Sequence, residues 1–136
     1  MRFRSPGELR RLRDDPTLIG PAVEEFLRLQ SPLQIGQRKA TKDVEFSSAV
    51  IPAGAFIHLC IAGANRDPEV FDDPENVDIG RHPNPQIAFG AGQHICLGNT
   101  LGRIEGRIAI GRFVERFANM RQTGTQRYHG PAKLPG

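Results

Sequence analysis

The clearest hydrophobic pattern of the chain lies near its C-terminal end, over residues 97–117. Apolar residues recur there in steps of four and three positions, which is the spacing of one side of an α-helix. They are Leu97, Leu101, Ile104 and Ile108, continued by Ile110, Phe113, Val114 and Phe117. Charged residues lie between them, namely Arg103, Glu105, Arg107, Arg112, Glu115 and Arg116. The pattern predicts a long amphipathic helix.

A shorter helix is predicted over residues 21–30. Pro21 suits the first turn of a helix, and the pair Ser31 and Pro32 ends it. Glu25 and Arg28 are three positions apart, so both side chains project from one side of this helix as a charge pair. Taken alone, such a pair is typical of a solvated helix surface.

Between the two helices the hydrophobic pattern has a period of two, as short β-strands have. The apolar residues of this pattern are Val44, Phe46, Phe56, Ile57, Leu59 and Ile61. Turn-forming residues interrupt them at 43, 47–48 and 51–54. We therefore expect a small antiparallel sheet, with Cys60 in an apolar strand of the core. Helices and strands together predict a mixed α+β fold.

Composition indicates a folded globular protein, because charged residues make up 24% and hydrophobic residues 38% of the 136 positions. We expect a single domain over 1–136, with a glycine- and proline-containing tail at 118–136. The net charge of +3 comes from scattered arginines without interleaved aromatic residues, which argues against nucleic-acid binding. No run approaches the ~18 apolar residues that cross a bilayer. Without a secretory signal, we expect a cytoplasmic protein with reduced cysteines and no membrane attachment.

The richest candidate chemistry lies in residues 89–98, Phe-Gly-Ala-Gly-Gln-His-Ile-Cys-Leu-Gly. Gly90 and Gly92 permit backbone angles and close approaches that a side chain would block. Cys96 follows them at the expected start of the long helix. The positive end of the helix dipole favours the thiolate form of a cysteine in that position. Cys96 is therefore a candidate metal ligand or nucleophile.

Competing interpretations of this loop fare less well. A lone cysteine is most often a small buried apolar residue, but the flanking glycines speak for a special loop. A dinucleotide-binding G-x-G-x-x-G loop would need glycine where Ile95 stands. A covalently attached c-type haem would need C-x-x-C-H, which the sequence lacks.

The string F-G-x-G-x-H-x-C-x-G resembles the haem-binding loop of cytochrome P-450. The resemblance implies that Cys96 is the proximal thiolate ligand of haem b iron, a ligation that favours O–O bond cleavage. It implies further that Phe89 shields the sulfur and that His94 donates to a haem propionate. The cofactor-binding residues it implies are Arg38, Phe89, Gly90, Gly92, His94, Cys96 and Gly98.

Other landmarks follow in the order typical of this family. The Glu25–Arg28 spacing resembles the E-x-x-R signature of helix K, and Arg81 occupies the place of the arginine that completes a buried structural triad. Arg38 stands where many bacterial members reach a haem propionate, and Leu33, Gln34 and Ile35 stand where relatives border the substrate. The chain departs from the pattern at Ser48, where relatives often have glycine, and at Gln86, where many have histidine.

The resemblance implies the C-terminal part of the cytochrome P-450 fold: helix K, a small β-sheet, the meander, the cysteine loop and helix L. The distal helix, with its pair of an acidic or amide residue and a threonine, would lie before Met1. The function implied is oxygen insertion into a small organic substrate, with electrons from a ferredoxin- or flavoprotein-type donor. A second chain or self-association would cover the distal side of the haem. The alternatives are a non-catalytic haem-binding fragment, such as a truncated product, and one subunit of a split enzyme.

Overall fold

The computed structural model describes residues 6–117 of the chain. Three α-helices form most of its helical part, α1 (Pro6–Asp14), α2 (Ile19–Leu29) and α4 (Asn99–Arg116). A 3-10 helix at Pro16–Leu18 joins α1 to α2, and a single short turn, α3 (Ile61–Ala64), follows the strands. The predicted tail at 118–136 lies outside the described residues.

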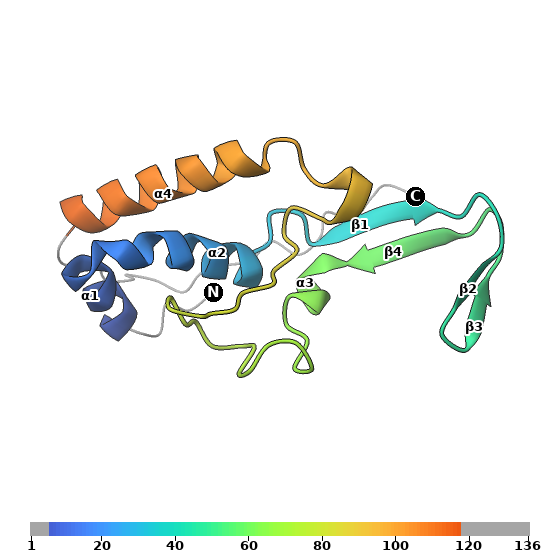
Figure 1. The fold of residues 1–136 in the computed structure, drawn as a ribbon, viewed down its shortest axis with the longest axis horizontal. Helices are drawn as coiled ribbons and strands as arrows, with labels where there is room; N and C mark the ends of the chain where they lie inside the picture. Colours follow the sequence, from blue (N-terminus) through green and yellow to red (C-terminus); the bar gives the residue numbers. More distant parts are fainter. Residues whose placement is uncertain (1–5, 118–136) are drawn as a thin grey trace, which may run out of the picture.

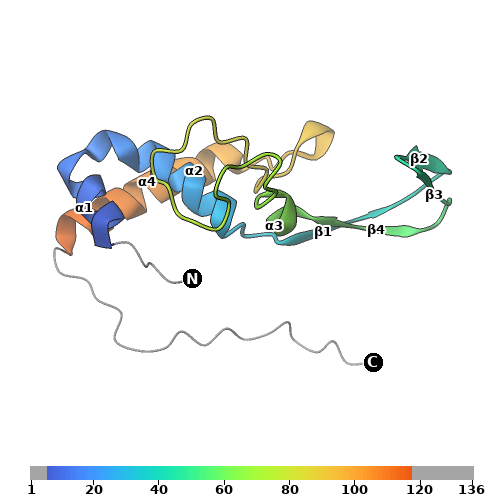
Figure 2. The same cartoon turned by 90° about the horizontal axis from the view of Figure 1, so that it is seen from below.

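Helices α2 and α4 lie side by side, and α1 packs at the end of this pair (Figures 1 and 2). A small apolar core joins the three helices to the segment before the cysteine. Its buried members are Leu12, Ala22, Ile79 and Val114. The helix predicted over residues 21–30 is thus present, but it begins two residues earlier, at Ile19.

Helix α4 contacts its neighbours through glycines as well as through Ile110 and Val114, which pack in the apolar core. A Cβ atom placed on Gly106 would lie 3.0 Å from Val23 Cγ1, and one on Gly102 would lie 3.2 Å from the Phe89 ring. The missing side chains let the two helix backbones approach closely. We call this contact the glycine seam.

Only part of the predicted apolar side of α4 packs in this structure. Leu101 is 59% and Ile108 61% exposed, whereas Val114 is buried. Leu97 lies before the first residue of α4 and is fully exposed. The periodicity gave the right element, but the glycine seam decides which side of it faces α2.

The strands form two separate antiparallel ladders instead of one sheet. In the first, β1 (Ile35–Lys39) pairs with β4 (Phe56–Cys60), so that Ile35 lies opposite Cys60. In the second, β2 (Val44–Phe46) pairs with β3 (Ala49–Ile51). Figure 2 shows both ladders extending away from the helices as an arm.

Most side chains on this arm are exposed. Phe46 is 69% and Phe56 70% exposed, so the period of two does not mark a buried side here. Cys60 is exposed as well, and the prediction that it belongs to the core is wrong. The arm has no element packed on it among residues 6–117 that would bury these side chains.

Candidate cofactor site

The cysteine loop, residues 89–98, is shaped by two glycines in the left-handed region. Gly90 has φ 76° and Gly92 has φ 67°, values that side chains disfavour. The Gly90 N–H donates to the Ile87 carbonyl at 2.8 Å, and the Cys96 N–H donates to the Phe89 carbonyl at 2.8 Å. These bonds bring the two ends of the loop together.

Cys96 presents a free, exposed thiol at the end of this loop. Its carbonyl accepts hydrogen bonds from the Asn99 backbone N–H at 3.1 Å and from the Asn99 side-chain amide at 2.7 Å. A Cβ atom on Gly98 would lie 3.8 Å from the Cys96 sulfur. The expected helix start at Leu97 is displaced to Asn99, so Cys96 precedes the helix by three residues.

The remaining charged or polar side chains expected at the cofactor are those of His94 and Arg38. His94 ends a 3-10 turn, Gly92–His94, within the cysteine loop and is exposed. Arg38 lies on β1, exposed, and donates to the carbonyl of its neighbour Gln37 at 2.7 Å. Both side chains are accessible to an anionic group.

The three residues expected to border a substrate lie at the start of β1. Leu33 and Ile35 are each 55% exposed. Gln34 accepts a hydrogen bond from the Ala62 N–H at 3.1 Å through its carbonyl, which ties this segment to α3.

Glu25, Arg28 and Arg81 come together in the structure. Arg28 donates to both carboxylate oxygens of Glu25 at 2.8 Å, and Arg81 Nε donates to Oε2 at 3.2 Å. Glu25 and Arg28 are fully buried. The solvated-surface interpretation of the pair is therefore wrong for this chain.

Arg28 also holds the irregular segment at 65–88, which we call the meander. Its guanidinium donates to the carbonyls of Asn65 at 2.8 Å, Pro74 at 2.7 Å and Asn76 at 3.3 Å. The same group lies 5.1 Å from the centre of the Phe71 ring. One buried cation thus fixes helix α2 to the chain that leads to the cysteine loop.

The charge state of Glu25 follows from these partners. Burial opposes ionisation, but hydrogen bonds from Arg28 and from the Asp78 N–H, with the charges of Arg28 and Arg81, outweigh it. The net effect holds the pKa of Glu25 below its ordinary value of 4.5. Glu25 is therefore an anion matched by two cations.

Sequence reasoning missed a second buried tie to the loop, through Asn65. Its side-chain amide donates to Ser31 Oγ at 2.8 Å, and its side-chain carbonyl accepts from the Ile87 N–H at 2.8 Å. The sequence offered no signal for this role.

The donor chemistry of the site fits a haem. Cys96 offers one sulfur donor on an accessible loop, and the side chains of Arg38 and His94 are exposed. Among residues 6–117 no cluster of three or more His, Cys, Asp or Glu side chains could hold a metal ion. A single thiolate suits a metal whose other ligands come from a macrocycle.

Comparison with known proteins identifies the family. The sequence model described as Cytochrome P450 matches residues 15–129. The chain belongs to the cytochrome P450 family, as the resemblance predicted, and that family implies a haem cofactor.

Two relatives illustrate the extent of the match. The chain is 44% identical over 115 residues to a biotin biosynthesis cytochrome P450 of Bacillus subtilis, covering 85% of this chain and 29% of that protein. It is 46% identical over 113 residues to a vitamin D(3) 25-hydroxylase of Pseudonocardia autotrophica, covering 82% and 28%. The chain thus spans less than a third of the length of these relatives.

Solved structures confirm the partial fold. P450BioI, in complex with an acyl carrier protein bearing hexadec-9Z-enoic acid, matches with a TM-score of 0.89 and 41% identity, over 93% of this chain and 33% of that one. A cytochrome P450 of Bacillus subtilis described as versatile matches with a TM-score of 0.87, 40% identity and coverages of 93% and 35%. The predicted α+β part of the P450 fold is confirmed. Within the described residues, no helix is long and apolar enough to cross a membrane.

Proposed function

We propose that this chain is the proximal, haem-binding part of a cytochrome P450 monooxygenase, with Cys96 as the iron ligand. The observation that carries the proposal is the accessible Cys96 thiol, which lies just before α4 in a loop with two left-handed glycines. Haem, when bound, supplies the oxygen-activating chemistry of the family. A cytoplasmic location is part of this proposal.

The chain's own residues would bind and support the cofactor. The exposed side chains of Arg38 and His94 can donate hydrogen bonds to the propionates, and a planar guanidinium suits a carboxylate. Phe89 lies partly buried beside the loop, where it can keep water from the sulfur. Leu33, Gln34 and Ile35 are proposed to border a small organic substrate, and electrons would come from a ferredoxin or flavoprotein donor.

We propose that a second polypeptide or a second copy of the chain covers the distal side of the haem, opposite Cys96. Support comes from the exposed apolar side of α4, where Leu101, Ile104 and Ile108 lie open. Large exposed apolar surface usually marks an interaction site. The relatives are about three times as long as this chain, as coverages of 28% to 35% show.

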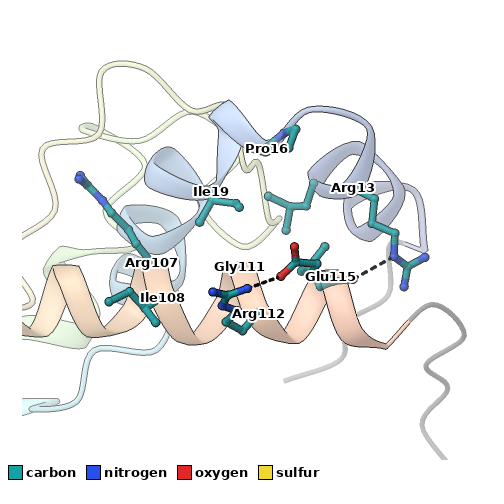
Figure 3. Close-up of a pocket in the computed structure, with 10 residues that line it drawn as sticks. Arg13, Pro16, Ile19, Arg107, Ile108, Gly111, Arg112 and Glu115 are labelled. Carbon is teal, nitrogen blue, oxygen red and sulfur yellow. Dashed lines mark hydrogen bonds and ion pairs between the residues drawn. The ribbon is translucent and has the colours of Figure 1, made fainter.

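A groove beside this side of α4 supports the same proposal. Figure 3 shows it between the end of α1, the start of α2 and α4. The groove measures about 690 Å³ and has apolar walls that include Leu12, Ile19 and Ile108. Arg112 on its edge pairs with Glu115 at 3.1 Å. An apolar side chain of a covering polypeptide would fit there.

The ligand assignment is tested by spectroscopy of the haem-loaded, reduced chain under CO. We expect the red-shifted Soret band of thiolate ligation. Cys96→His should move the band to the position of histidine-ligated haem while some haem stays bound. Cys60→Ser is the matched control, because Cys60 is the second free thiol and lies on the arm.

An unchanged spectrum in Cys96→His would contradict the proposal. Loss of the thiolate band in Cys60→Ser would do the same, since the ligand would then lie on β4. Thiolate ligation without any electron consumption would instead favour the non-catalytic haem-binding fragment, whereas turnover that returns only with a second polypeptide would favour one subunit of a split enzyme.

A further inference from the structure

We propose that Arg103 and Glu24 form a clamp that positions the Cys96 loop, with Arg103 as its central positioning residue. This inference rests on the proposed function of that loop. The clamp is separate from the buried Glu25–Arg28–Arg81 triad, whose arginines bind the meander. Glu24 belongs to α2 and Arg103 to α4, so the clamp bridges the two helices.

Arg103 contacts three residues with one guanidinium. Its Nε donates to Glu24 Oε1 at 2.8 Å, and its Nη1 donates to Asn99 Oδ1 at 3.0 Å. Its guanidinium carbon lies 4.8 Å from the centre of the Phe89 ring. A planar guanidinium can pair, donate and stack at the same time, which a lysine ammonium cannot.

Glu24 extends the clamp to the segment before the loop. Its second oxygen, Oε2, accepts from the Gln86 side-chain amide at 2.8 Å. Gln86 in turn accepts from the Ala88 N–H at 2.7 Å. The glutamine that departs from the family pattern is thus a working part of the clamp in this chain.

Both peptide groups of Cys96 are held by residues that Arg103 contacts. The Cys96 N–H donates to the Phe89 carbonyl at 2.8 Å, and the Cys96 carbonyl accepts from the Asn99 side chain at 2.7 Å. Arg103 stacks on Phe89 and fixes Asn99, so it acts on both sides of the cysteine. We infer that it sets the direction in which the thiol points.

The energetics agree with positioning rather than with bulk stability. The side chains of Arg103 and Glu24 are 29% and 24% exposed, so solvent weakens their attraction. The effect of removing the pair should therefore be local to the loop. A buried structural pair would instead affect the whole molecule.

The test uses the full chain with Cys60→Ser, so that Cys96 is the remaining thiol. Hydrogen exchange of haem-free protein is followed in residues 89–98, with residues 19–29 as an internal reference. The variants are Arg103→Ala, Glu24→Ala and Arg103→Lys. Arg112→Ala is the matched control, because it breaks an exposed pair with Glu115 on the same helix.

We expect exchange in 89–98 to rise about three- to tenfold in Arg103→Ala and Glu24→Ala, and to stay unchanged in 19–29. Arg103→Lys should raise exchange less than Arg103→Ala does, because lysine keeps the positive charge but lacks the planar guanidinium with its several donors. In the haem-loaded, reduced protein under CO, the variants with faster loop exchange should show a smaller fraction of the thiolate-ligated Soret band.

Equal loop exchange in Arg103→Ala and Arg112→Ala would overturn the clamp, as would a parallel rise in 19–29. The exchange measurement needs no haem, so the two proposals fail separately. If Cys96→His leaves the CO spectrum unchanged while the exchange pattern appears, the ligand assignment is lost and the clamp stands. The reverse pair of results removes only the clamp.

Discussion

Glu25 is the residue at which charge and burial are most tightly balanced. It is fully buried, yet it accepts hydrogen bonds from Arg28, Arg81, Asn84 and the Asp78 N–H. A buried ion pair need not stabilise a fold more than apolar residues would. Removing one partner, however, leaves a stranded charge. The consequences of single substitutions here are therefore large.

Arg28→Ala should lower the free energy of unfolding by about 3–5 kcal/mol, because it strands Glu25 and leaves buried carbonyls of the meander unpaired. Chemical denaturation of variant and parent measures the difference. Arg11→Ala is the control, because its pair with Glu8 has side chains 50% and 20% exposed and should cost about 1 kcal/mol or less. Coincident curves for Arg28→Ala and parent would contradict the buried triad.

The lowered pKa of Glu25 gives stability a defined pH dependence. Its stabilising effect is fully present above the ordinary value of 4.5 and is lost as the pH falls through the lower pKa of the folded state. In acid, the unfolded chain binds the proton first. Denaturation midpoints should therefore fall below about pH 4.5. Glu25→Gln should be less stable at every pH and should lose this part of the dependence of stability on pH. An identical pH dependence in variant and parent would contradict the lowered pKa of Glu25.

At the scale of elements, the packing of α4 depends on glycines, which have no side chain to hold its neighbours away. Gly102 and Gly106 stand one helical turn apart and face Phe89 and Val23. Gly111 lies further along α4, near Ile19, where a Cβ would meet Cδ1 at 3.5 Å. The glycine seam is thus tight at Gly106 and roomier at Gly111.

Two substitutions in the glycine seam should have opposite effects. Gly106→Val should destabilise the fold by about 1–3 kcal/mol, because its Cβ would start 3.0 Å from Val23 Cγ1. Gly111→Ala should stabilise it by about 0.5–1 kcal/mol through helix propensity, since its contact is ordinary. Thermal melts of both variants decide the matter. A stabilising Gly106→Val would show that the seam has spare room.

Sequence reasoning found α2, α4, the strands and the turn glycines because each has a local signature. It could not find which side of α4 packs, because periodicity marks all apolar positions alike. Val114 is buried while Leu101 and Ile108 are exposed, although all three fit the same helix. Nor could it find the clamp, whose residues Glu24, Gln86 and Arg103 meet only through the fold. The triad was predicted from family resemblance, since its spacing alone is common.

At the scale of the whole molecule, the described residues would form one side of the proposed cofactor site. The loop, the triad and the clamp all lie within residues 24–103. The apolar residues of α4 and the strands remain exposed, Phe46 at 69% and Ile108 at 61%. Such a surface favours association with another polypeptide.

We predict that the haem-loaded chain alone consumes electrons without making product. Water reaching an uncovered cofactor would divert electrons from the substrate, because no closed site excludes it. The measurement is turnover with an electron donor and a panel of small hydrophobic substrates, alongside the mass of the particle in solution. Stoichiometric hydroxylated product from a monomer would overturn this prediction.

Arg28 also ties the order of folding to the shape of the native chain. Its carbonyl partners Asn65, Pro74 and Asn76 lie 37, 46 and 48 residues further along the sequence. Closing loops of that length costs conformational entropy before any contact repays it. Helix α2 can form early, but its arginine cannot leave water until the meander arrives. Desolvation of Arg28 and closure of the chain around it therefore belong to a single late event, the one that also delivers the cysteine loop.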